Sequence, residues 1–215
     1  MAALGALATF SLEPYKIYPL IFCFSFAIYG ICKVSNLKEA FYLSFSFAFG
    51  WFFLGLYWIA NAFLVKSGFY IFLMPLAAAL LPLFLSLTWS IAFLFAKLMS
   101  PKIGEIHINI IIFLSIFEYL RGKLLNFPWL MPGSFFASDE VLIQGFSFIG
   151  SYSMNLVFFI ITILPILIIK YKKLSILPIF LLFTPTVFLF VKSYDRYSTK
   201  AIPSYNENHL INVIQ

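Results

Sequence analysis

The chain has 215 residues, of which 63% are hydrophobic and only 10% are charged. Soluble domains are about 45–50% apolar and about 25% charged, so a water-soluble globule of this size lacks the charges to cover its apolar side chains. A lipid bilayer removes that conflict, because apolar residues can face hydrocarbon. The net charge of +6 comes from basic residues placed singly or in short groups between apolar runs, which is typical of membrane-protein loops and not of a nucleic-acid surface.

Charged residues divide the chain into runs that are continuously apolar rather than alternating, which predicts helices. In chain order the runs lie at residues 2–10, 17–32, 40–65, 67–96, 108–117, 141–169 and 174–191. About 20 apolar residues cross the hydrocarbon core, so the first run is too short and the fifth needs the residues up to 121 to complete a crossing. The sequence therefore predicts an all-α integral membrane protein with about seven transmembrane helices.

The loop charges predict an orientation. If the chain crosses seven times, the loops on one side contain seven lysines and the loops on the other side contain four basic residues. The positive-inside rule places the lysine-rich side and the N-terminus in the cytoplasm. Residues 121–149 then lie outside, and their prolines, Pro128 and Pro132, exclude one continuous helix. Because this segment is rich in Leu, Phe and Trp, we expect a long extracytoplasmic loop at the membrane interface.

The same pattern divides the chain into two parts. Residues 1–192 are predicted to form the polytopic membrane domain, and residues 193–215 a polar extracytoplasmic tail. The tail ends in the β-branched and apolar residues 211–215, which resemble the first strand of a further domain. Cys23 and Cys32 are nine residues apart and point to roughly opposite faces of a helix, which predicts two buried thiols rather than a disulfide or a metal site. No cofactor is expected.

Two charged residues near the end of an apolar run are the strongest polar feature. Glu118 and Arg121 are three residues apart, so they share one helix face and can form an ion pair. Pairing lowers the cost of an ionisable group close to hydrocarbon. Arg121 is one of only two arginines, and its planar guanidinium suits a phosphate group. Two interpretations stay open: an ion pair that anchors the helix end, and a contact with a phospholipid headgroup.

Aromatic motifs occur on both sides of this pair in the sequence. Residues 126–129 read Asn-Phe-Pro-Trp, in which Pro128 stiffens a turn and Trp129 is suited to the membrane interface. Trp129 is either an ordinary interfacial anchor or part of a binding site. Earlier in the chain, residues 50–58 contain two glycines that are five apart and end in Trp58. The glycines predict close packing of this helix against a neighbour.

In combination, these segments resemble the membrane part of the apolipoprotein N-acyltransferase family. That family has a Gly- and Phe-rich helix ending in Trp, matched by residues 49–58, and an E-[aromatic]-L-R-G helix end, matched by residues 118–122. A G-F-P-W segment follows in the family, matched by residues 126–129 with Asn in place of Gly. A Gly-containing turn into the next span resembles residues 148–152, and the first-loop F-S-P-Y resembles residues 10–15.

The resemblance implies a function. Enzymes of this family transfer an acyl chain from a membrane phospholipid to the N-terminus of a diacylated apolipoprotein through a cysteine thioester. Their Glu-Lys-Cys triad lies in an extracytoplasmic nitrilase-like domain, and the chain is expected to stop before that domain, with a tail like its first strand. We therefore expect no catalytic residue in this chain and no acyl transfer by this chain alone, unless a second chain supplies the missing domain.

The resemblance also implies a location, partners and a site. The chain is expected in the bacterial cytoplasmic (inner) membrane, where it meets phospholipid and diacylated apolipoprotein, with no nucleic-acid partner. The residues expected to bind lipid are Glu118, Arg121, Phe127, Pro128, Trp129 and Trp58. Two other functions stay open, an inert membrane remnant and a small transporter. A transporter is disfavoured because the predicted spans contain almost no charged residues to line a path.

Overall fold

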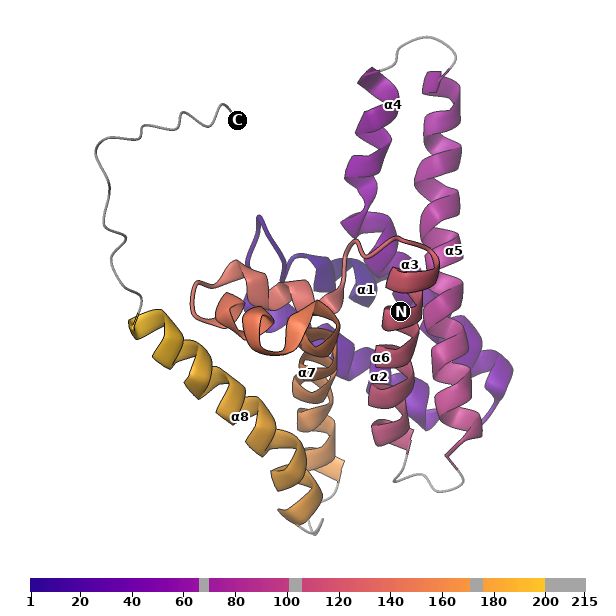
Figure 1. The fold of residues 1–215 in the computed structure, drawn as a ribbon. Helices are drawn as coiled ribbons and strands as arrows, with labels where there is room; N and C mark the ends of the chain where they lie inside the picture. Colours follow the sequence, from indigo (N-terminus) through magenta and orange to yellow (C-terminus); the bar gives the residue numbers. More distant parts are fainter. Residues whose placement is uncertain (66–69, 101–105, 171–175, 200–215) are drawn as a thin grey trace, which may run out of the picture.

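The computed structural model describes residues 1–65, 70–100, 106–170 and 176–199, and this part of the chain contains helices and no strands (Figure 1). In chain order the elements are α1 (Ala2–Thr9), η1 (Tyr18–Ile21), α2 (Phe22–Lys33), α3 (Leu37–Gly55), η2 (Tyr57–Ala60), α4 (Asn61–Val65), α5 (Tyr70–Leu98), α6 (Ile106–Leu124), η3 (Pro132–Ser138), η4 (Leu142–Gln144), α7 (Gly145–Lys170) and α8 (Ile176–Ser198). Those labelled η are short 3-10 helices. The predicted all-α fold is confirmed for these residues, whereas the predicted strand at 211–215 lies outside them.

Two helices in the described part of the chain are long and apolar enough to cross a membrane. They cover Ile71–Leu98, within α5, and Leu142–Leu167, which joins η4 to α7. A third span results if α3 and the segment Tyr57–Leu64 count as one bent helix. The prediction of a helical protein with membrane-spanning segments is supported to this extent, and the number of about seven crossings stays a prediction.

The apolar run at residues 40–65 does not form the single straight helix that its lack of charges predicts. α3 ends at Gly55, and the axis bends by 53° before Tyr57–Leu64 continue. At Leu56 the backbone leaves helical geometry, with φ of −110° and ψ of 9°. Trp58 follows directly after the bend and packs against Trp129 from the loop after α6. The bend therefore creates a contact between two segments that are far apart in the sequence.

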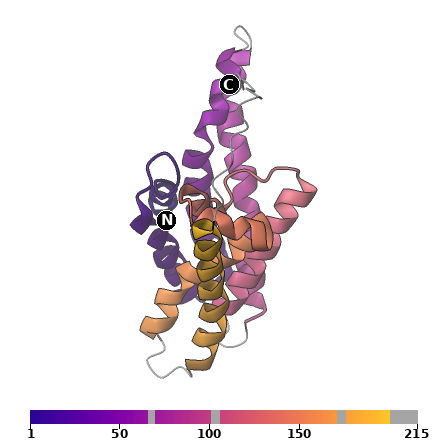
Figure 2. The same ribbon diagram turned by 60° about the vertical axis from the view of Figure 1, so that its left-hand side comes forward.

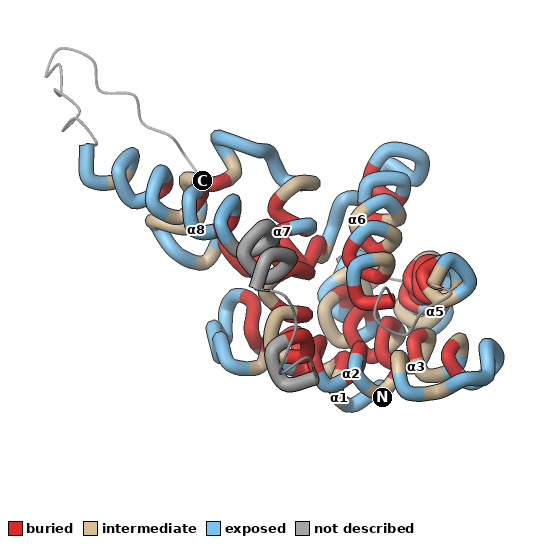
Figure 3. The backbone as a smooth tube through the Cα atoms, turned by 90° about the horizontal axis from the view of Figure 1, so that it is seen from below, coloured by how far each residue is buried: buried red, intermediate tan, exposed pale blue. Residues whose placement is uncertain are grey.

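The buried residues gather where α2, α3, α5, α6 and α7 face one another, whereas much of α8 is exposed (Figure 3). The centre of this core is an aromatic cluster of seven buried side chains: Phe24, Phe47, Trp51, Phe52, Trp89, Phe158 and Phe159. Most of its pairs are edge-to-face, and such pairs stabilise a core beyond their buried area. The cluster thus ties α2, α3, α5 and α7 together.

α1 and α3 pack at backbone contact distance because each presents a glycine to the other. A Cβ atom on Gly50 would lie 1.9 Å from the carbonyl oxygen of Ala2, and one on Gly5 would lie 1.9 Å from that of Phe47. Small residues are what allow two helix backbones to approach so closely. The predicted role of Gly50 in close helix packing is confirmed, and this packing fixes the start of the first loop, which follows α1, relative to α3.

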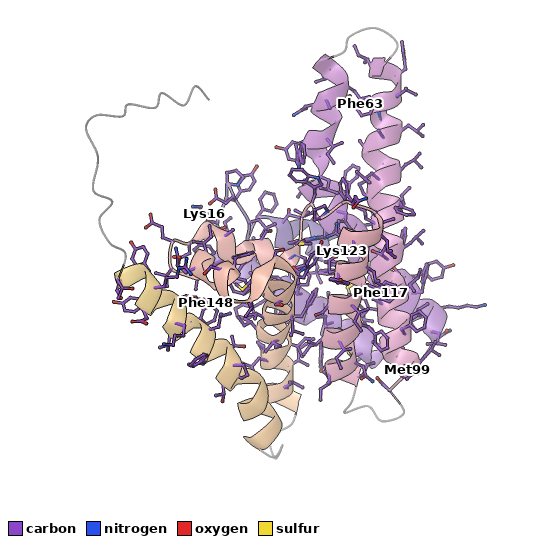
Figure 4. The ribbon with its side chains drawn as sticks, viewed as in Figure 1. Lys16, Phe63, Met99, Phe117, Lys123 and Phe148 are labelled. Atoms are coloured by element: carbon purple, nitrogen blue, oxygen red, sulfur yellow. The ribbon has the colours of Figure 1, made fainter. Side chains whose placement is uncertain are left out.

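The α4–α5 hairpin rises beyond the rest of the helix bundle (Figure 2). Figure 4 places Phe63 of this hairpin and Met99 near the end of α5 at opposite ends of the molecule, with Lys16 and Lys123 between these two levels. The 29 residues of α5 make it about 43 Å long at 1.5 Å per residue, which exceeds the roughly 30 Å of a bilayer core. One end of α5 therefore reaches past the hydrocarbon if the helix stands upright.

The segment between α6 and α7 is not one helix, as its prolines predict. α6 continues to Leu124, the short helices η3 and η4 follow, and α7 is kinked at Gly150, which has φ of 75°. α8 runs to Ser198, past the domain boundary predicted at residue 192, and that boundary stays a prediction. Cys23 is buried and Cys32 is half-buried, and the two do not form a disulfide.

Candidate functional site

A pocket of about 670 Å³ lies where three segments from distant parts of the sequence meet. The segments are the first loop, the end of α3 with η2, and the loop after α6 with η3. Their lining residues are Thr9, Phe10, Leu12, Glu13, Pro14, Tyr15, Leu54, Gly55, Tyr57, Trp58, Trp129, Leu130, Ser134 and Ala137. This volume lies within the range of pockets that enclose a small molecule or part of a lipid.

Two tryptophans form one wall of the pocket. The rings of Trp58 and Trp129 meet edge-to-face with 5.6 Å between their centroids, and these residues are 45% and 54% exposed. A tryptophan with one buried face and one accessible face presents apolar surface together with an N–H donor. Of the six residues predicted to bind lipid, Trp58 and Trp129 line the pocket, while Phe127 and Pro128 lie in the same loop as Trp129.

The other two predicted residues lie beneath that loop, inside the protein. Glu118 is 0% exposed and Arg121 is 2% exposed. The predicted ion pair is present and bidentate, with Arg121 Nε 2.9 Å from Glu118 Oε1 and Arg121 Nη2 2.7 Å from Glu118 Oε2. Bidentate pairs of this kind are the strong, geometrically specific form of a charge-assisted hydrogen bond.

The free edge of the Arg121 guanidinium holds the loop that contains Trp129. Nη1 donates to the carbonyl oxygen of Phe127 at 3.0 Å and to that of Trp129 at 2.8 Å. One face of the guanidinium lies over the ring of Phe52, 5.4 Å from its centroid. Arg121 thus acts within the protein in this structure, and contact between lipid and any of the six residues stays a prediction.

Trp89 is a hydrogen-bond partner of Glu118 that the sequence did not single out. Its indole Nε1 donates to Glu118 Oε1 at 2.8 Å, and the side chain is fully buried in the aromatic cluster. Glu118 therefore accepts hydrogen bonds from two elements, α5 and α6. Trp89 lies inside an uncharged run, between Thr88 and Ser90, and nothing in that run indicates that its indole meets a carboxylate on another helix.

The loop with Trp129 has unusual backbone geometry at both ends. Asn126 has φ of 49° and Leu130 has φ of 54°, in the left-handed region that side chains disfavour. Such a residue costs on the order of 1–3 kcal/mol and persists where its surroundings hold it. Asparagine tolerates this region better than other residues with a side chain. This explains how Asn126 can stand where the family motif has Gly.

An ion pair lies at the rim of the pocket. Lys16 Nζ is 2.8 Å from Glu13 Oε1, and it also donates to the carbonyl oxygen of Ser138 at 3.4 Å. The hydrogen bond to Glu13 and the charge of that carboxylate raise the pKa of Lys16 above its usual value of 10.5. Both side chains are well exposed, so the pair contributes charge and a contact between two loops rather than much stability.

Within the described ranges, no group of three or more His, Cys, Asp or Glu side chains is placed to hold a metal ion.

The site predicted from the sequence leaves out the first loop, although Glu13, Pro14 and Tyr15 form part of the pocket wall. The signal for them was the resemblance of residues 10–15 to the first loop of the family.

In the described ranges the chain is helical, two of its helices are long and apolar enough to cross a membrane, and its loops form an aromatic pocket. A sequence model of the apolipoprotein N-acyltransferase N-terminal domain matches residues 4–164. The chain belongs to the apolipoprotein N-acyltransferase family, as its motifs predicted.

Several curated relatives show the same relationship. The chain is 34% identical over 159 residues to the apolipoprotein N-acyltransferase of Rhodopseudomonas palustris, a match that covers 71% of this chain and 30% of that protein. For the Sinorhizobium fredii relative the identity is 31% over 176 residues, covering 76% and 33%. For the Rickettsia prowazekii relative it is 30% over 181 residues, covering 81% and 36%. The chain spans about a third of the length of these relatives.

Proposed function

We propose that this chain forms the membrane domain of an apolipoprotein N-acyltransferase and that its pocket receives an acyl chain of the donor phospholipid. The proposed reaction moves that acyl chain to the N-terminus of a diacylated apolipoprotein. The observation that carries the proposal is that residues from three family-like segments, 10–15, 49–58 and 126–129, line one pocket.

The chemistry of the pocket suits an acyl chain. Its walls are mostly aromatic and aliphatic, and burial of each CH₂ group of a lipid contributes about 0.8 kcal/mol. In the proposal, Trp58 and Trp129 pack against the chain, while Glu13 and Lys16 at the rim lie at the level of the headgroup. Glu118 and Arg121 shape the loop from beneath, because their polar atoms face each other and the loop carbonyl oxygens.

The proposal includes an orientation in the bacterial cytoplasmic membrane, with the N-terminus in the cytoplasm and the pocket facing outward. Lys33 and Lys97 lie in the last turns of α2 and α5, whereas the pocket rim lies in loops assigned to the opposite side of the membrane. The loops on the side of Lys33 and Lys97 contain more lysines than the loops on the pocket side, which supports this orientation through the positive-inside rule.

We also propose that acyl transfer needs polypeptide beyond these 215 residues. The family mechanism uses a cysteine nucleophile, and a reactive cysteine needs an accessible, electropositive environment. Cys23 is buried in the hydrophobic core, and Cys32 lies at the Lys33 end of α2, away from the pocket residues. A second polypeptide that carries a nitrilase-like domain is the proposed complement.

Two experiments test the proposal. First, the chain is reconstituted in bilayers with a phospholipid that carries a photoreactive acyl chain. Trp129→Ala and Trp58→Ala are expected to lower cross-linking of the pocket peptides several-fold, whereas Phe84→Ala, which removes an exposed aromatic ring from α5, leaves it unchanged. Equal cross-linking in all variants would refute lipid binding in this pocket.

The second experiment measures acylation of a diacylated lipopeptide with the chain alone, with a nitrilase-like partner polypeptide alone, and with both. Activity is expected only in the mixture. Activity of the chain alone would overturn the proposal that it lacks the nucleophile. An inactive mixture in which both polypeptides are folded and associated would favour an inert membrane domain.

A further inference from the structure

A continuous line of hydrogen bonds joins the aromatic cluster to the loop at residues 126–130, here called the Trp129 loop. Trp89 on α5 donates a hydrogen bond to Glu118, and Glu118 also accepts hydrogen bonds from Nε and Nη2 of Arg121. Arg121 in turn donates to two carbonyl oxygens of the loop. All three side chains are buried. The line therefore runs through the interior, where hydrogen bonds are protected from competing water.

The Trp129 loop needs such a support. It begins and ends at residues with left-handed backbone geometry, Asn126 and Leu130, so the loop conformation is strained. The two carbonyl oxygens that accept from Arg121 belong to Phe127 and Trp129, which lie between the two strained residues. Pro128, between them, has no backbone N–H and so cannot donate a bond that would close the loop on itself.

Arg121 can hold the loop only while its guanidinium keeps one orientation. Glu118 sets that orientation by accepting from Nε and Nη2, which leaves Nη1 pointing at the loop. Trp89 in turn donates to Glu118 Oε1, the oxygen that also accepts from Arg121 Nε. The indole ring itself is fixed by aromatic neighbours, among them Phe52 at 5.0 Å between ring centroids.

We infer that Trp89 is a positioning residue for the Trp129 loop: through Glu118 and Arg121 it holds Trp129 against Trp58 in the wall of the pocket. The effect of Trp89 on acyl transfer rests on the proposed function, whereas its effect on the position of the Trp129 loop does not. Trp89 does not line the pocket and touches no substrate in the proposal. Its contribution comes from one N–H group.

Trp51 provides a matched control within the same aromatic cluster. It is also fully buried, and its ring stacks with that of Trp89 at 6.2 Å between centroids. Its indole N–H has no hydrogen-bond partner among the residues that the structure describes. Trp51→Phe and Trp89→Phe therefore remove the same atoms from the same cluster, and they differ in whether a donor to Glu118 is lost.

The test places 5-fluorotryptophan in the chain, reconstituted in lipid nanodiscs, and records the ¹⁹F resonance of Trp129, assigned with Trp129→Phe. Loss of a hydrogen bond to a charged group is expected to raise the population of a displaced loop at least about tenfold. In Trp89→Phe the Trp129 resonance should therefore shift or divide into two, and in Trp51→Phe it should stay as in the parent chain. The same pattern is expected for acyl transfer by the chain mixed with its nitrilase-like partner.

An unchanged Trp129 resonance in folded Trp89→Phe, or an equal change in both variants, overturns the inference. If Trp89→Phe does not fold, Arg121→Lys decides, because lysine keeps a charge beside Glu118 but has no planar fork to reach both carbonyl oxygens. An unchanged resonance in that variant also overturns the inference. If the parent mixture shows no acyl transfer, the proposed function fails while the ¹⁹F result still judges the role of Trp89.

Discussion

Replacing Arg121 with Met is expected to destabilise the chain strongly, because it leaves a carboxylate buried without its counter-charge. Glu118 is 0% exposed and would keep one donor, the indole of Trp89. Removing one partner of a buried pair costs about 3–5 kcal/mol. The two loop carbonyl oxygens also lose their donor, so the upper part of that range is expected. Glu118→Leu alone should cost a similar amount, since it leaves a buried guanidinium unpaired.

The double variant, Glu118→Leu with Arg121→Met, separates the ion pair from its surroundings. Replacing both members of a buried pair with apolar residues is often close to neutral. The double variant should therefore cost at least about 2 kcal/mol less than the sum of the two single variants, as coupled neighbours do. The free energy of unfolding is measured by denaturant titration in mixed micelles, with Phe84→Ala as a surface control. Additivity within about 0.5 kcal/mol would refute a coupled buried pair.

Three further outcomes are expected. Gly50→Leu should disrupt the α1–α3 contact and lower thermal stability, since even a Cβ would lie 1.9 Å from a backbone oxygen of α1; an unchanged melting temperature would contradict that packing. Gly133→Ala should loosen η3 from α7, because its Cβ would lie 2.7 Å from the backbone nitrogen of Asn155, and proteolysis between α6 and α7 should accelerate. The hydrogen bond from Tyr197 on α8 to Glu140 raises the pKa of Tyr197 above 10.0. This bond therefore stabilises the contact between α8 and Glu140 below pH 10, and the stabilisation is lost as pH rises through the raised pKa. An NMR titration of labelled tyrosine should show a lower pKa for Tyr197 in Glu140→Ala.

The sequence predicts those features that depend on neighbours along the chain. Uncharged runs predict the helices because the signal is local, and α5 covers nearly all of the run at 67–96. The spacing of Glu118 and Arg121 predicts their ion pair because residues three apart share a helix face. Prolines predict the interrupted segment after α6, and a pair of glycines in α3 predicts one close helix contact.

The features that the sequence does not predict depend on contacts between distant segments. No proline lies at the bend after Gly55, so the sequence does not predict this bend. The partner of Glu118 on α5 is an indole in an uncharged run, and the contact of its N–H with Glu118 is seen only when α5 and α6 are packed together. The burial of Arg121 is of the same kind, since a lone arginine near a helix end fits equally well with a headgroup contact and with an interior role.

The placement of a charge pair inside an apolar bundle is best understood as a means of fixing geometry. A buried ion pair contributes little net stability, because desolvation of both charges offsets their attraction. Four of the five N–H groups of Arg121 are nevertheless directed at named acceptors, two on Glu118 and two on loop carbonyl oxygens. An apolar pair of similar volume would fill the space but leave those carbonyl oxygens unpaired and the strained Trp129 loop unsupported. The pair is therefore expected to matter more for where Trp129 lies than for whether the helices fold, and the double variant should recover stability without recovering the parent resonance of Trp129.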